Sequence, residues 1–79
     1  MPEEYVPTAE EIAGHYSAAL DSVTLINELA ALEELTEEDS ATISRNVEHL
    51  EIMVGKDFWT TEDLTPLTGA ITAGKAAVA

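Results

Sequence analysis

The sequence predicts an all-α fold: a small three-helix domain in which a long helical hairpin carries a short third helix. Three stretches have apolar residues at steps of three and four, which is the spacing of amphipathic helices. Each of these stretches follows a threonine with an acidic residue three positions later, a helix-start signal. A chain of 79 residues has room for one such domain.

The first helix is expected over about residues 9–32, with its end between residues 29 and 35. Thr8 can cap it, because its hydroxyl can accept a hydrogen bond from the backbone N–H of Glu11 while the Glu11 carboxylate reaches back. The apolar stripe of this helix consists of Ile12, Tyr16, Ala19, Leu20, Val23, Ile26 and Ala30. Residues 1–7 precede the helix and are predicted to be a flexible arm, which leaves residues 8–79 as a single helical domain.

The second helix is expected over residues 37–54, with Thr36 as its cap. Its stripe consists of Ile43, Val47, Leu50 and Val54. Gly55 follows the last of these residues. Because glycine has no Cβ, it adopts positive φ at little cost, and we expect it to end the helix in the left-handed conformation.

The third helix is expected over residues 61–77. Thr60 can cap it together with Asp63, and Trp59 can then fold onto Leu64 as a hydrophobic staple. Pro66 then lies in the first turn of this helix; the alternative is a start at Pro66, with Thr65 as the cap and Pro66 at the first helical position. The core predicted for the three helices consists of Ile12, Tyr16, Leu20, Val23, Ile43, Val47, Leu50, Val54, Leu64, Leu67 and Ile71.

The charge of the chain excludes several functions. Sixteen Asp and Glu residues stand against three Lys and Arg, which gives −13, and residues 1–39 contain eleven of the acids and none of the bases. Because binding to phosphates depends on basic side chains, we expect no direct contact with nucleic acid or an anionic membrane. No apolar run approaches the roughly 20 residues of a membrane span. The predicted location is the cytoplasm, with a virion as the second possibility.

No catalytic motif is present, and we predict a protein that is not an enzyme and uses no cofactor or metal. His15 and His49 lack the H-E-x-x-H arrangement of zinc sites and lie away from the apolar stripes, so both are expected at the surface. The acidic stretch of residues 33–39 lacks the alternating ligands and the glycine of a calcium loop.

A second set of apolar residues predicts a partner surface. Leu25, Leu29 and Leu32 project from the side of the first helix opposite its stripe, where a three-helix bundle of unequal helices leaves them uncovered. We expect this face to bind a protein, either a second copy in a homodimer or a host or virion protein. The residues assigned to the surface are Leu25, Leu29, Leu32, Glu28, Glu33, Glu37 and Trp59. Trp59 can instead close the end of the bundle.

The alternative function is inhibition of a host nucleic-acid-binding protein. Carboxylates spaced along a helix can imitate the phosphates of DNA, which carry one negative charge per roughly 1.7 Å of duplex. The acids of the first helix leave a gap across residues 13–20, so one copy alone imitates a duplex poorly. The two functions differ in their expected salt dependence.

Two stretches resemble a known group of proteins. NVEHLEIMVGKDFWTTEDLTPLTGAITAGKA (residues 46–76) and SAALDSVTLIN (residues 17–27) are similar to short acidic proteins of tailed phages that infect marine cyanobacteria, and KDFWTTEDL is the distinctive string. The resemblance covers about half of the chain. It implies a phage origin and an intracellular or virion setting, and it implies no activity, cofactor or functional residue.

Overall fold

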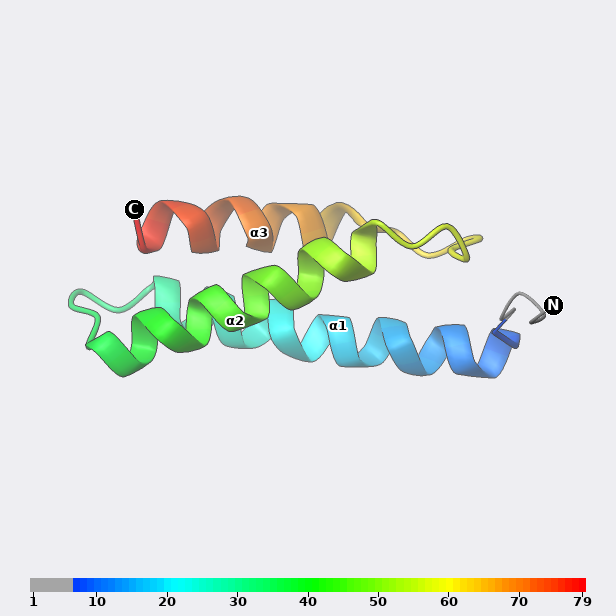
Figure 1. The fold of residues 1–79 in the computed structure, drawn as a ribbon, viewed down its shortest axis with the longest axis horizontal. Coiled ribbons are helices and arrows are strands. Elements are labelled where there is room, and N and C mark those ends of the chain that lie inside the picture. The colour runs from blue at the N-terminus through cyan, green and yellow to red at the C-terminus, as the bar shows by residue number, and fades with distance from the viewer. Residues whose placement is uncertain (1–6) are drawn as a thin grey trace, which may run out of the picture.

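The computed structural model describes residues 7–79, which form three α-helices: α1 (Ala9–Ala30), α2 (Glu37–Val54) and α3 (Thr65–Ala77). The helices α1 and α2 make an antiparallel hairpin, and α3 runs back along the C-terminal half of α1 (Figure 1). Each helix packs against the other two. The predicted fold, a long hairpin with a short third helix, is confirmed. The predicted arm lies outside the described residues except for Pro7, which is buried.

The first helix begins as predicted. The Glu11 backbone N–H donates to Oγ1 of Thr8 at 3.1 Å, and the Thr8 N–H donates to the Glu11 carboxylate at 3.0 Å. The helix ends at Ala30 and not at residue 32. Its last turn tightens, since the N–H of Leu32 bonds to the carbonyl of Leu29, and the chain then turns towards the next cap.

The second helix has the predicted bounds and the predicted Thr36 cap, which Asp39 completes with hydrogen bonds of 3.0 and 3.2 Å. The prediction for Gly55 is wrong: its φ of −78° and ψ of −11° are right-handed. The helical turn continues one step further, because the Gly55 N–H donates to the Glu51 carbonyl and the Lys56 N–H to the Met53 carbonyl. These bonds satisfy the final carbonyls without a left-handed residue.

The third helix begins at Thr65, four residues later than the predicted residue 61, and Pro66 lies in its first turn. The predicted pairing of Thr60 with Asp63 does not form. The backbone N–H of Thr60 donates to the Glu62 carboxylate at 3.1 Å, and Asp63 accepts from the Thr65 N–H at 3.0 Å. Each carboxylate therefore caps a short turn of its own. The alternative start is wrong by one residue, because Thr65 lies inside the helix and Leu64 precedes it without a side-chain cap.

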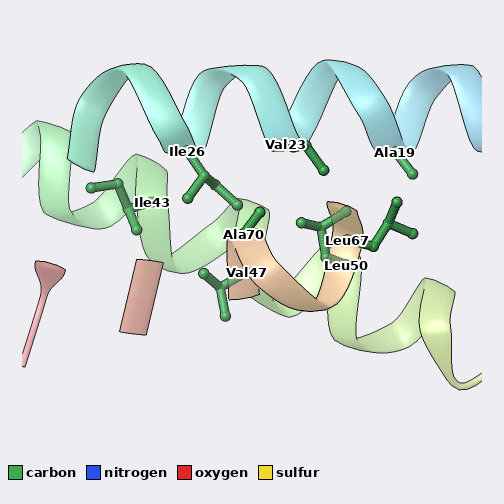
Figure 2. Close-up of a cluster of buried hydrophobic side chains, with 8 residues drawn as sticks. All are labelled: Ala19, Val23, Ile26, Ile43, Val47, Leu50, Leu67 and Ala70. Atoms are coloured by element: carbon green, nitrogen blue, oxygen red, sulfur yellow. The ribbon is translucent and has the colours of Figure 1, made fainter. Parts of the chain in front are cut away.

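The core lies where the three helices meet (Figure 2). Its central cluster consists of Ala19, Val23, Ile26, Ile43, Val47, Leu50, Leu67 and Ala70. Of the other predicted core residues, Ile12 is buried, whereas five are only partly buried and pack at the margin: Tyr16, Leu20, Val54, Leu64 and Ile71. The predicted list omitted the buried Ala19, Ile26, Met53 and Ala70.

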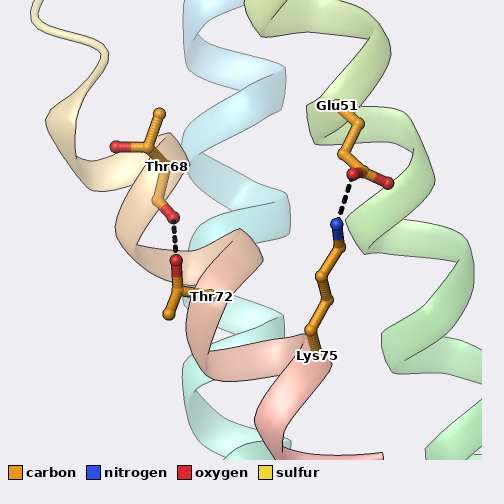
Figure 3. Close-up of polar contacts among 4 residues, drawn as sticks. All are labelled: Glu51, Thr68, Thr72 and Lys75. Atoms are coloured by element: carbon orange, nitrogen blue, oxygen red, sulfur yellow. Dashed lines mark hydrogen bonds and ion pairs between the residues drawn. The ribbon is translucent and has the colours of Figure 1, made fainter.

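Small residues of α3 let it lie close to the hairpin. Ala70 and Gly74 are both buried. A Cβ added at Gly74 would lie only 2.5 Å from Cγ2 of Val47. At the outer edge of the contact between α3 and the hairpin, Nζ of Lys75 pairs with the carboxylate of Glu51 at 2.7 Å and links α3 to α2 (Figure 3). Both partners are exposed, so the ion pair adds little to stability beside the apolar contacts.

Candidate functional site

The three leucines assigned to the partner surface have different environments. Leu25 is 37% exposed and Leu32 is 48% exposed. Leu29 is half-buried and packs against the core. The two exposed leucines are therefore available to a partner, while Leu29 supports the position of the helix between them.

Carboxylates accompany the exposed leucines. Glu28 lies near the end of α1, Glu33 in the connection that follows, and Glu37 in the first turn of α2, and all three are exposed. Within residues 7–79 none of them takes part in an ion pair. We call Leu25, Leu32 and these three glutamates the acidic leucine surface.

Trp59 does not belong to that surface. The connection between α2 and α3 lies at the end of the bundle away from the connection between α1 and α2 (Figure 1). The indole Nε1–H of Trp59 donates to the Met53 carbonyl at 2.8 Å, and the side chain is half-buried. Trp59 therefore closes the end of the bundle, which was the other role considered for it.

The N-terminal half of α1 meets this connection through aromatic rings. The rings of His15 and Phe58 stack with centroids 5.5 Å apart and planes 21° apart. The Tyr16 ring meets the Trp59 ring edge-on at 6.0 Å, and the Tyr16 hydroxyl donates to the Asp63 carbonyl at 2.6 Å. We call His15, Tyr16, Phe58 and Trp59 the aromatic end.

Sequence reasoning placed His15 at the surface, and the residue is exposed, but its stacking on Phe58 was missed. A signal for the contact was present. The pair His15-Tyr16 and the pair Phe58-Trp59 are the two places where ring-bearing residues are adjacent in the sequence. Because flat side chains pack well on one another, two such pairs in a small domain are good candidates for a contact.

An open-sided pocket of about 390 Å³ lies beside the aromatic end and is lined by His15, Met53, Lys56, Asp57 and Phe58. Met53 is buried, Phe58 is half-buried, and the three polar residues are exposed. The pocket thus has an apolar wall with charged groups around it. Its volume falls in the range of small-molecule sites, roughly 300–1,000 Å³.

Two carboxylates near the start of α3 have shifted pKa values. A hydrogen bond from the Thr60 backbone N–H lowers the pKa of Glu62 below its ordinary value. Hydrogen bonds from Thr65, first from its side chain and then from its backbone, lower the pKa of Asp63. Both shifts arise from groups that hold the turn before α3, so they indicate a structural role for the two acids.

Two features of the described chain are thus candidates for function, the acidic leucine surface and the pocket at the aromatic end. Over residues 7–79, no cluster of three His, Asp or Glu side chains is placed to hold a metal ion. No helix of that part is long and apolar enough to cross a membrane. No protein-family model, curated protein sequence or solved structure matches the chain.

Proposed function

We propose that the chain is a small, non-enzymatic interaction module that binds a protein through the acidic leucine surface. The observation that carries the proposal is the exposure of Leu25 and Leu32, because within residues 7–79 the other large aliphatic side chains, apart from Ile52 and Val78, are buried or partly buried. Burying an apolar side chain against a partner is favourable by about 25 cal/mol per Å² removed from water. Leu25 on α1 and Leu32 in the connection that follows it therefore give a partner apolar surface on which to gain affinity.

The charges around the leucines define the partner. Glu28, Glu33 and Glu37 are exposed and have no ion-pair partner in the described part of the chain. A protein with an apolar centre and a basic rim complements this surface, and charge complementarity also speeds the encounter. A second copy would bring another −13 to the same place, so the preferred partner is a different, basic protein.

The origin of the chain enters the proposal through the resemblance to acidic phage proteins over residues 17–27 and 46–76. On that basis the partner is a host or virion protein, met in the host cytoplasm or during particle assembly. The resemblance names neither the partner nor the residues that contact it. The acidic leucine surface is assigned from exposure and charge alone.

The second candidate is a mimic of DNA that blocks a host nucleic-acid-binding protein. It is favoured by the charge distribution, since residues 1–39 hold eleven acids and no base. In this case the carboxylates would provide the affinity and the leucines little. Binding would then weaken steeply between about 0.15 M and about 0.5 M salt, because screening shortens the reach of exposed charges.

The test compares three variants of the tagged chain in a pull-down from a bacterial lysate. One variant carries Leu25→Gln and Leu32→Gln, a second carries Glu28→Gln, Glu33→Gln and Glu37→Gln, and the control carries Ile52→Gln. Ile52 is the matched control because it is 62% exposed and lies on α2 outside the acidic leucine surface. Circular dichroism first checks that all variants keep the helix content of the parent chain.

We expect a basic protein that the parent chain and the control retain at about 0.5 M salt and that the leucine variant loses. The same protein captured by all variants would contradict the proposed surface. Capture that depends only on the glutamates and disappears in salt would favour the DNA mimic. Recovery of the chain alone, as a dimer that the leucine variant abolishes, would show self-association in place of a separate partner.

A further inference from the structure

We infer that the pocket at the aromatic end binds a small, planar aromatic molecule that carries an anionic group. The proposed function uses the opposite end of the bundle and does not involve this pocket. Each proposal can therefore fail without the other. The volume of the pocket, its rings and its charged groups without a partner each support this class of ligand.

The volume of the pocket suits a small ligand. The pocket of about 390 Å³ has Met53 and Phe58 as its apolar lining. Met53 belongs to the buried part of α2, and its carbonyl accepts the hydrogen bond from Trp59. The fold thus holds one wall of the pocket in place. The site therefore loses less conformational entropy when a ligand binds.

The rings favour an aromatic ligand. The rings of His15 and Phe58 already lie nearly parallel, with 21° between their planes. The ring of Trp59 meets the Phe58 ring edge-on, with centroids 4.8 Å apart. A flat ligand can stack on such a ring pair with the same offset geometry. Stacking of this kind contributes beyond the burial of apolar area.

The polar groups of the pocket favour a ligand that has both an anionic group and an N–H donor. Within residues 7–79 the Lys56 ammonium makes no ion pair, and no hydrogen bond occupies the ring nitrogens of His15. Both groups line the pocket and can donate to a carboxylate or a phosphate. The Asp57 carboxylate in the same wall can accept from a ring N–H or an amino group of the ligand.

Four of the five residues that line the pocket come from the less acidic part of the sequence. Residues 40–79 contain all three basic residues and five acids, whereas residues 1–39 contain the other eleven acids. At about 0.15 M salt, charges further than roughly 8 Å are largely screened. The Lys56 ammonium, a lining group, therefore acts on a ligand more strongly than the distant acidic leucine surface does.

Two sources of such a ligand are distinguished by two pairs of probes: adenosine 5′-monophosphate with adenosine, and indole-3-acetate with indole-3-acetamide. In each pair the ring is constant and the charge changes. The intact ¹⁵N-labelled chain is titrated with each probe up to about 10 mM at about 0.15 M salt, and NMR shifts identify the residues affected. The shifts are expected at His15, Lys56 and Phe58, with the anionic member of at least one pair binding more tightly.

Lys56→Met is the decisive variant, and Lys75→Met is its matched control. Both remove one exposed positive charge, but Lys75 pairs with Glu51 on another part of the surface. We expect Lys56→Met to weaken the anionic probe about tenfold, to the level of its neutral counterpart, and Lys75→Met to change it little.

The outcomes separate cleanly. Tighter binding of the nucleotide alone, or of the indole carboxylate alone, would support the inference. It would also show whether the pocket prefers a phosphate or a carboxylate. Failure of all four probes to shift the pocket residues would overturn the inference. It would also be overturned by equal binding of charged and neutral probes, or by an equal loss in the two lysine variants.

Discussion

Gly74 of α3 faces Val47 of α2 so closely that a methyl group at Gly74 would lie 2.5 Å from Cγ2 of Val47. The same methyl group would lie 3.1 Å from Cγ2 of Ile26 on α1 and 3.2 Å from that of Ile43. These three neighbours are β-branched and buried, so none of them can turn aside freely. The position of α3 against the hairpin therefore depends on the absence of a side chain at Gly74.

Overpacking a core usually costs about 1–3 kcal/mol, and alanine regains roughly 1 kcal/mol because it is the better helix former. Gly74→Ala is therefore expected to destabilise the domain by up to about 2 kcal/mol. Gly69→Ala is the control, because a Cβ there meets nothing within 4 Å. It should stabilise the domain by about 0.5–1 kcal/mol. Urea unfolding followed by circular dichroism measures both, and equal stabilisation by the two changes would contradict the close approach.

Two apolar residues of α2 test the assignment of core and surface. Leu50 is fully buried, whereas Ile52 is 62% exposed. Leu50→Ala should cost about 2–5 kcal/mol, since it removes buried methyl groups and leaves a cavity. Ile52→Ala should change the free energy of unfolding by less than about 0.5 kcal/mol. A large loss at Ile52 in the same unfolding experiment would show that another surface covers it.

The helices that local signals specify were predictable from the sequence. The caps at Thr8 and Thr36 use hydrogen bonds within four residues, and both form as predicted. The stripes of α1 and α2 likewise gave Val23, Ile43, Val47 and Leu50 as core residues. Such features need no knowledge of the rest of the fold, because the helix period alone brings the residues together.

Features that depend on tertiary contacts were not predictable in the same way. The burial of Gly74 follows from how closely three helices approach, which the helix period alone does not reveal. The region before α3 depends on which N–H group each of two carboxylates accepts from, since Glu62 takes that of Thr60 and Asp63 takes that of Thr65. For the candidate sites, the sequence indicated the exposed leucines but not the pocket, whose lining comes from α1, α2 and the following connection.

Tyr16 links α1 to the connection that precedes α3. Its hydroxyl donates to the Asp63 carbonyl at 2.6 Å. Tyr16→Phe keeps the ring against Trp59 and removes this bond, so it should cost about 0.5–1.5 kcal/mol. Tyr16→Leu also removes the ring contact and should cost more. Unfolding followed by the fluorescence of Trp59, the single tryptophan, measures both. Identical stability of the parent and Tyr16→Phe would show that the hydroxyl bonds equally well to water.

Asp63 should give the stability of the domain a pH dependence. Hydrogen bonds from Thr65 lower its folded-state pKa below the ordinary value of 3.8, so the unfolded chain binds a proton more readily than the folded chain. The stabilisation is thus complete above the ordinary pKa and is lost as pH falls through the lowered one. Acid also relieves repulsion among the other carboxylates, which acts in the opposite direction.

The effect of Asp63 is therefore measured as a difference between the parent and Asp63→Asn, whose side chain can still accept from the Thr65 N–H but does not titrate. Urea unfolding at several pH values from about 6 to about 2 gives the free energy of each protein. The parent should lose stability relative to the variant as the pH falls through this range. An unchanged difference between the two proteins would mean that the pKa of Asp63 is the same in the folded and the unfolded chain.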